Sequence, residues 1–151
     1  MEQIIQLNNQ AKLSEHFTLG EFTRSASHPE VYNIPSHEAI ANLKRLCVWL
    51  EVLRERSGGP VRINSGYRSP QLNRKIGGAP TSNHLTGCAC DIKVSGMEQA
   101  LRYAVILLDY SDESKQEFDE LLIEKNRYGA IWVHFAVRTS NNRRKVLFIN
   151  A

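Results

Sequence analysis

The clearest periodic pattern in the chain is an apolar stripe at helical spacing across residues 36–57. Ile40, Leu43, Cys47, Leu50 and Leu53 recur every three or four positions, which is typical of an amphipathic helix with one buried face. Ser36 is a suitable N-cap, and Gly58-Gly59 ends the run. The pattern therefore predicts one long helix, with Cys47 on its buried side.

Three shorter helices are indicated by their start signals. Thr18-Leu19-Gly20-Glu21 and Ser95-Gly96-Met97-Glu98 both have the spacing of a capping box, and the second should open a helix that runs to about Tyr110. Ser69-Pro70 combines an N-cap with proline at the first helical position, so a short helix is expected to about Ile76.

Five segments have the short apolar runs or alternation of β-strands: 61–68, 89–94, 121–125, 131–136 and 146–150. Residues 126–129 form a hairpin-like link between the third and fourth. Together these elements predict an α+β fold: a small antiparallel sheet with helices packed on one side. We expect a single domain over residues 1–151, in which the weakly patterned residues 1–13 form an extended arm.

The composition and charge of the chain argue against a nucleic-acid-binding protein and against a membrane protein. The 151 residues are enough to bury a core, and the formal net charge of +3 is too small, without clustered Lys/Arg and aromatics, to favour nucleic-acid binding. No apolar run approaches the ~20 residues of a membrane-spanning helix, and the first residues lack the features of a signal peptide. We therefore expect either a protein made in the cytoplasm or one whose leader has been removed, in both cases without membrane insertion. We also expect a monomer.

Three residues form a candidate metal site. His84 precedes the 89–94 strand, Asp91 lies on it, and His134 lies on the 131–136 strand. Two histidines and a carboxylate leave one position of a tetrahedral zinc open, which is the coordination of a catalytic site rather than a structural one. Aspartate is disfavoured in the middle of a strand, so Asp91 needs a compensating partner such as a cation.

Strand alternation bears on a rival site formed by Cys88 and Cys90. Soft thiolates could bind zinc together with His84. On a continuous strand, however, both cysteines point to the face opposite Asp91, so they cannot join it at one ion. Burial in the core is the favoured interpretation of both cysteines, and thiolate binding of zinc is the alternative.

These residues resemble those of a known family. Ser82-x-His84-x-x-Gly87-x-Ala89-x-Asp91 with Trp132-x-His134 is similar to the motifs of the zinc D-Ala-D-Ala carboxypeptidase and L-alanyl-D-glutamate endopeptidase family of bacterial and phage peptidoglycan peptidases. That family shares its fold with the hedgehog signalling domain. The segments 17–25 and 61–69 also resemble the small phage-type members, so the resemblance extends over residues 14–137.

The resemblance implies roles for individual residues. His84, Asp91 and His134 would be the ligands of a Zn²⁺ ion. Arg68 would hold a carboxylate or carbonyl of the substrate, for which a planar guanidinium is suited. It also suggests that Ser82 supports the site or contacts substrate, and that Tyr67 is either a wall of the cleft or part of the core.

One position departs from the family pattern. Many members carry the catalytic glutamate as Glu-x-x-His, but here that position is Ile131, on the opposite face of the strand from His134. Glu124, whose surroundings resemble the Leu-Ile-x-Glu segment of the phage-type branch, is the best substitute. A turn at 126–129 would bring it beside His134. Asp119 is the second candidate for the base.

The resemblance implies a zinc metallopeptidase that cleaves bonds next to D-amino acids in peptidoglycan stem peptides, as a carboxypeptidase or an endopeptidase. Such a protein would act on the cell wall, and the missing leader favours a phage or mobile-element origin, for instance as an endolysin. The alternative function is a non-catalytic, zinc-containing module that binds the wall or has a structural role.

Overall fold

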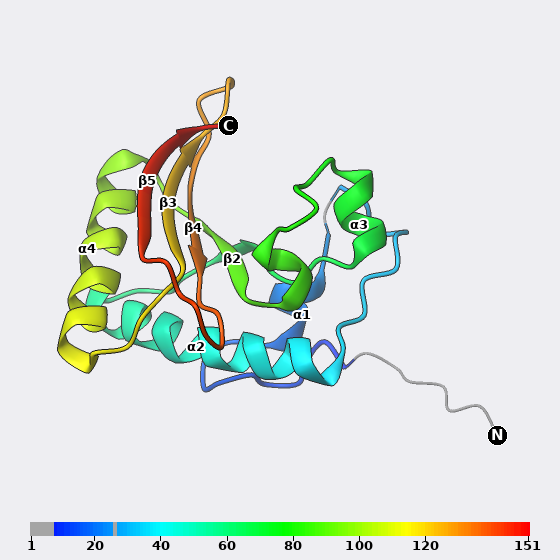
Figure 1. Cartoon of the computed structure of the whole chain (residues 1–151), viewed down its shortest axis with the longest axis horizontal. Coiled ribbons are helices and arrows are strands. Elements are labelled where there is room, and N and C mark those ends of the chain that lie inside the picture. Colours follow the sequence, from blue (N-terminus) through cyan, green and yellow to red (C-terminus); the bar gives the residue numbers. More distant parts are fainter. Residues whose placement is uncertain (1–7, 26) are drawn as a thin grey trace.

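The computed structural model describes residues 8–25 and 27–151 (Figure 1). The order of elements is α1 (Leu19–Thr23), α2 (His37–Ser57), β1 (Ile63–Ser65), α3 (Pro70–Lys75), the 3-10 helix η1 (Asn83–Thr86), β2 (Ala89–Lys93), α4 (Met97–Ser114), β3 (Glu120–Lys125), β4 (Ile131–Ala136) and β5 (Lys145–Asn150). The five strands form one sheet in the order β1-β2-β4-β3-β5. The α+β class predicted from the sequence is therefore confirmed.

The sheet is antiparallel except at one edge. The pairs β1–β2, β2–β4 and β3–β4 are antiparallel, as expected, whereas β5 pairs with β3 in parallel. After Ala136 the chain passes the first residue of β3, Glu120, and β5 then pairs with the edge of β3 that faces away from β4. β5 therefore runs in the same direction as β3. The strand predicted over 61–68 is also shorter than expected, since only Ile63–Ser65 is strand.

The helix ends follow from local capping, with one exception. Ser36 accepts a hydrogen bond from the Ala39 amide, and Gly58 ends α2 in the left-handed region at φ 78°. The expected capping box of α4 does not form, because Gly96 is the N-cap. This helix also continues past Tyr110 to Ser114. Tertiary packing accounts for the extension, since the Tyr110 ring lies 4.9 Å from Trp49.

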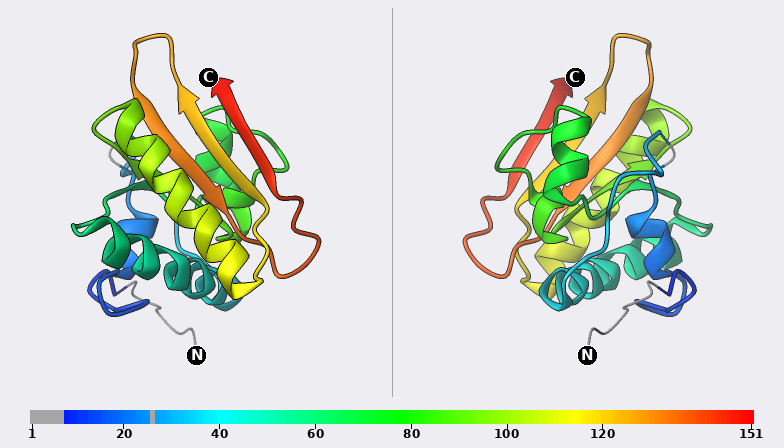
Figure 2. Two further views of the ribbon diagram at one scale, coloured as in Figure 1. Left: turned by 90° about the vertical axis from the view of Figure 1, so that its left-hand side faces the viewer. Right: turned by 90° about the vertical axis from the view of Figure 1, so that its right-hand side faces the viewer.

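The hydrophobic core lies between α2, α4 and one face of the sheet. Trp49 of α2 packs against Phe118 and Phe135, with ring centroids 6.2 and 5.3 Å away. Figure 2 shows α4 crossing this face in its left view, and α3 with the segment after it on the opposite side in its right view. The long helices thus cover one face, and the other face is available to line a cleft.

The N-terminal arm expected over residues 1–13 falls partly outside the described residues, which begin at residue 8. Leu13 is buried in the core, and its amide donates to the carbonyl of Phe17. Within the described part of the chain, no helix has the length and apolar character needed to cross a membrane.

Candidate metal centre

The two strands that carry Asp91 and His134 are neighbours in the sheet, and these residues face each other across the β2–β4 pair. Alternation then places both side chains on the face that α4 does not cover, while Cys90, Ile92, Val133 and Phe135 enter the core. His84 reaches the same point from η1. Its backbone is set by Ser82, whose hydroxyl accepts a hydrogen bond from the His84 amide, and by Gly87 at φ 75°.

The three side chains converge on one point. One ligand atom from each of His84, Asp91 and His134 lies within 4.8 Å of the other two. The Asp91 Oδ1 atom is 3.4 Å from His84 Nε2 and 3.1 Å from His134 Nδ1. Both histidines are buried, at 1% and 8% exposure. The sequence prediction that these residues come together is therefore consistent with the structure.

The His84 ring is held so that its second nitrogen is free. Its Nδ1 lies 2.6 Å from the carbonyl oxygen of Gly66, which can only accept, so Nδ1 carries the hydrogen. The Nε2 atom is buried and makes no hydrogen bond among the described residues. A buried nitrogen with a lone pair aimed at a carboxylate and a second imidazole fits a metal ligand.

Hydrogen bonds and neighbouring charges in the centre shift the pKa values of His134 and Asp91 in opposite directions. Burial alone would lower the pKa of His134, but hydrogen bonds to Asp91 and Glu120 raise it to about 9. Burial would raise the pKa of Asp91, yet the neighbouring His84 and His134 hold it well below its usual range. A metal ion would therefore meet an ionised carboxylate and displace a proton from His134.

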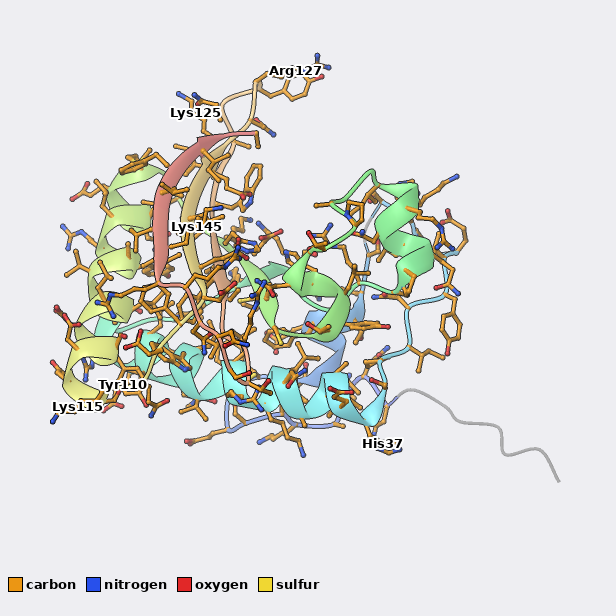
Figure 3. All side chains as sticks on the ribbon, in the orientation of Figure 1. His37, Tyr110, Lys115, Lys125, Arg127 and Lys145 are labelled. Carbon is orange, nitrogen blue, oxygen red and sulfur yellow. The ribbon has the colours of Figure 1, made fainter. Side chains whose placement is uncertain are left out.

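The centre lies in a cleft of about 570 Å³ between the sheet and residues 78–84. Arg68, Ser82, Glu120 and Glu124 also line it, and Lys145, labelled on β5 in Figure 3, lies at its edge. Tyr67 does not line this cleft. It is largely buried in the core and borders a smaller hollow beside it.

Glu124 shares the face of His134 because β3 and β4 pair with Leu122 opposite His134 and Glu124 opposite Trp132. Burial, with the charge of Asp91 adding to it, raises the pKa of Glu124, although His134 and a hydrogen bond from Trp132 oppose the change. A carboxylate with a raised pKa beside a metal-binding group is suited to exchange protons with a substrate.

Asp119, the second candidate for the base, has a different environment. Its side chain is completely buried and is not among the residues that line the cleft. Arg143 donates to both of its oxygens at 3.0 and 2.8 Å, and Asn83 donates to Oδ2 at 2.8 Å. Its lone pairs are thus taken up by structural hydrogen bonds.

Arg68 enters the cleft from the loop after β1. Its backbone amide donates to the carbonyl of His84 at 3.0 Å, and its Nη1 donates to Asn73 Oδ1 at 3.2 Å. Burial lowers the pKa of Arg68, while the charges of Asp91 and Glu124 act in the opposite direction. The guanidinium Nε is buried without a partner among the described residues.

Two further residues of the site were not identified from the sequence. Glu120 lies 3.0 Å from His134 Nε2, and Asn83 donates to the same Glu120 oxygen at 2.7 Å. Alternation gives a signal for Glu120, since it shares a face with Glu124, but its contact with His134 depends on the strand register. The contact of Asn83 depends on tertiary structure alone.

The cysteine site has no support in the described residues. Cys90 lies in the core, where burial raises the pKa of its thiol well above the ordinary value. Cys47 and Cys88 are also buried. The group of metal-capable side chains found in the described part of the chain contains no cysteine.

Comparison with known proteins identifies the family of this chain. The family model described as Peptidase M15 matches residues 15–127, which include His84, Asp91 and Glu124 but end before His134. The zinc D-Ala-D-Ala carboxypeptidase of Streptomyces albus G is 31% identical over 91 residues, which cover 60% of this chain and 36% of that protein. The chain thus matches about a third of its relative's length. Because the family model covers most of the chain, the protein belongs to the peptidase M15 family.

Proposed function

We propose that this protein is a zinc-dependent peptidase that cleaves a peptide bond next to a D-amino acid in bacterial peptidoglycan. The observation that carries the proposal is the convergence of His84, Asp91 and His134 in the cleft, where the buried Nε2 of His84 makes no hydrogen bond to any residue that the structure describes. Two imidazoles and one carboxylate suit zinc and leave a coordination position open. The similarity to a zinc D-Ala-D-Ala carboxypeptidase supports the same ion and the same class of substrate.

A zinc ion held by His84, Asp91 and His134 would lower the pKa of a bound water to ~7 and would polarise the scissile carbonyl. In our proposal Glu124 takes the proton of the attacking water and delivers it to the leaving amine. Its place in the cleft, on the face of His134, and its raised pKa support that role. Glu120 is less suited to it because the hydrogen bond with His134 lowers its pKa.

Arg68 is proposed to anchor the substrate. Its side chain borders both the cleft of the metal centre and the adjoining smaller hollow, so a peptide in the cleft would pass it. A guanidinium can bind the terminal or side-chain carboxylates of stem peptides with two parallel hydrogen bonds. Ser82 is proposed to support His84 through its N-cap hydrogen bond rather than to contact the substrate.

The wall substrate also implies that the protein acts outside the cytoplasm. An origin in a phage or mobile element stays a prediction from the sequence, as does the monomeric state. Carboxypeptidase and endopeptidase action would differ in whether Arg68 holds a terminal carboxylate or one on a side chain, so the test below includes a substrate of each kind.

The proposal is tested with zinc-loaded protein and two synthetic substrates, a stem pentapeptide ending in D-Ala-D-Ala and a stem peptide with an L-Ala-D-Glu bond. Glu124→Gln should keep one zinc per chain and lower kcat by about 100-fold or more, the usual contribution of a positioned general base. Glu117→Gln removes an exposed carboxylate just before β3 and should leave kcat unchanged.

Two results would count against the proposal. Parental activity in Glu124→Gln would exclude Glu124 as the base. A parent protein that binds zinc and is retained by peptidoglycan, yet cleaves neither peptide nor intact wall, would instead support a non-catalytic wall-binding module.

A further inference from the structure

The two ring nitrogens of His134 have different carboxylate neighbours. Nδ1 lies 3.1 Å from Asp91 Oδ1, on the side where His84 also points. Nε2 lies 3.0 Å from Glu120 Oε1, on the other side of the ring. Because the two nitrogens of an imidazole point in divergent directions, only Nδ1 faces the three-residue centre.

We propose that Glu120 is a positioning residue that fixes the His134 ring with Nδ1 toward the metal by accepting a hydrogen bond from Nε2–H. The inference rests on the proposed zinc site. A ligating histidine needs its second nitrogen protonated and bonded, because that bond selects the tautomer, fixes the ring and makes the ligand more basic. Glu120 supplies that bond for His134.

The two histidines of the centre are therefore oriented by different groups. His84 donates from Nδ1 to a neutral backbone carbonyl, that of Gly66, and presents Nε2. His134 presents Nδ1 and donates to a charged side chain. A carboxylate partner strengthens the hydrogen bond relative to a carbonyl, so Glu120 holds the His134 ring through the stronger of the two bonds.

Glu120 is itself held in place. Its Oε1 accepts a hydrogen bond from Asn83 Nδ2 at 2.7 Å, and its Oε2 lies 3.6 Å from Arg143 Nη2. Asn83 directly precedes His84, so a short path of contacts joins the η1 ligand to the β4 ligand through Glu120. The side chain of Glu120 is only 15% exposed, which limits competition from water for these bonds.

The register explains why Glu120 takes this role and Glu124 does not. Leu122 lies opposite His134, so the two glutamates flank it diagonally on the same face of β3. No hydrogen bond joins Glu124 to His134 in the described structure, whereas Glu120 meets Nε2. One glutamate is thus left to face the substrate and the other to orient a ligand.

The inference is tested by zinc affinity, measured by competition with a chromophoric chelator. Glu120→Ala should weaken zinc binding by about 10- to 100-fold, the usual effect of removing such a partner. Glu120→Gln keeps an oxygen that can accept from Nε2–H but loses the charge, so its affinity should lie between those of Glu120→Ala and the parent. The matched control is Glu117→Ala, which removes an exposed carboxylate just before β3. This variant should bind zinc like the parent.

A second readout needs no substitution at Glu120. Long-range ¹H–¹⁵N NMR of the zinc-loaded parent should show His134 with zinc on Nδ1 and a proton on Nε2. Zinc on Nε2, or affinity in Glu120→Ala within twofold of the parent, would overturn the inference. These results do not depend on peptide hydrolysis, so a protein that binds zinc through this network but cleaves nothing would contradict the proposed function and leave the role of Glu120 supported. A parent that binds no zinc would contradict both.

Discussion

At the scale of single residues, the position of Arg68 depends on the absence of a side chain at Gly78. Asn73 accepts the hydrogen bond from Arg68 Nη1 and donates to the carbonyl of Ala79 at 3.0 Å. Gly78 packs against this pair so closely that a Cβ atom there would lie 2.0 Å from Asn73 Oδ1 and 2.8 Å from Arg68 Nη1. Any larger residue must displace one or both side chains.

Gly78→Ala is therefore expected to raise KM about tenfold and to leave zinc affinity unchanged. The displaced Arg68 side chain would lose its hydrogen bond to Asn73 and with it the position needed to bind the substrate. A loss of about 1.5 kcal/mol corresponds to about tenfold weaker substrate binding. Steady-state kinetics on the cleaved stem peptide give KM, and chelator competition gives zinc affinity. Gly59→Ala is the control, because no atom lies within 4 Å of its added Cβ. An unchanged KM would show that the position of Arg68 does not limit substrate binding.

At the scale of elements, alternation along β2 and β4 predicted which face of the sheet carries Asp91 and His134, whereas His84 lies on neither strand. Alternation placed Asp91 and His134 on one face, and Cys90 with its apolar neighbours on the other, as the structure has them. Alternation also explains why position 131 does not carry the catalytic acid. Its side chain, that of Ile131, lies on the core side of β4 and packs against the core. Alternation is a dependable signal because a shift of one residue in strand register would move all the buried apolar side chains of that strand to the solvent face.

Other features of these elements depend on pairing partners and could not be predicted from local sequence. The parallel docking of β5 on β3, the end of α4 at Ser114 and the contact between Glu120 and His134 are all set by tertiary contacts. The capping box predicted at Ser95 does not form, and here the competing contact is local. The backbone amide of Ser95 donates to the side chain of Gln99 at 2.7 Å, and Gly96 takes the cap position.

Asp119, just before β3, is held by Asn83 of η1 and by Arg138 and Arg143 of the segment between β4 and β5, and this network should contribute to the acid sensitivity of the protein. Burial would raise the pKa of Asp119, but hydrogen bonds from Arg143 and Asn83 lower it from 3.8 to about 2. Since the folded state holds this carboxylate ionised, its contribution to stability is present above pH ~4 and is lost as the pH falls toward 2. The shift corresponds to about 2 kcal/mol of unfolding free energy.

Asp119→Asn should accordingly be less stable than the parent at pH 7, and the difference should shrink by about 2 kcal/mol between pH 5 and pH 2. Urea unfolding of the metal-free proteins across this range measures it. The control is Asp109→Asn, which removes an exposed carboxylate on α4. The difference in unfolding free energy between this variant and the parent should not change across the pH range. A stability difference for Asp119→Asn that does not vary with pH would mean that the network does not hold the carboxylate ionised.

At the scale of the whole molecule, the sheet separates two environments. The long helices α2 and α4 close a hydrophobic core on one side of the sheet (Figures 1 and 2). Residues 78–84 lie over the polar face and line the cleft of the metal centre. The proposed ligands come from η1, β2 and β4, so an ion bound by all three would link the covering segment to the sheet. Lys125 and Arg127 mark the hairpin tip at the end of the sheet away from α2 (Figure 3).

We propose that the His-Asp-His centre binds zinc and that the zinc-loaded protein cleaves peptidoglycan. The most direct measurement is digestion of purified peptidoglycan by the zinc-loaded protein, with new amino groups quantified and the released fragments identified by mass spectrometry. We predict that new amino groups appear at one bond next to a D-amino acid, disappear when a chelator removes the zinc, return when zinc is restored, and are absent with His84→Ala. A parent protein that binds one zinc per chain yet releases no new amino groups from any peptidoglycan type would contradict the claim.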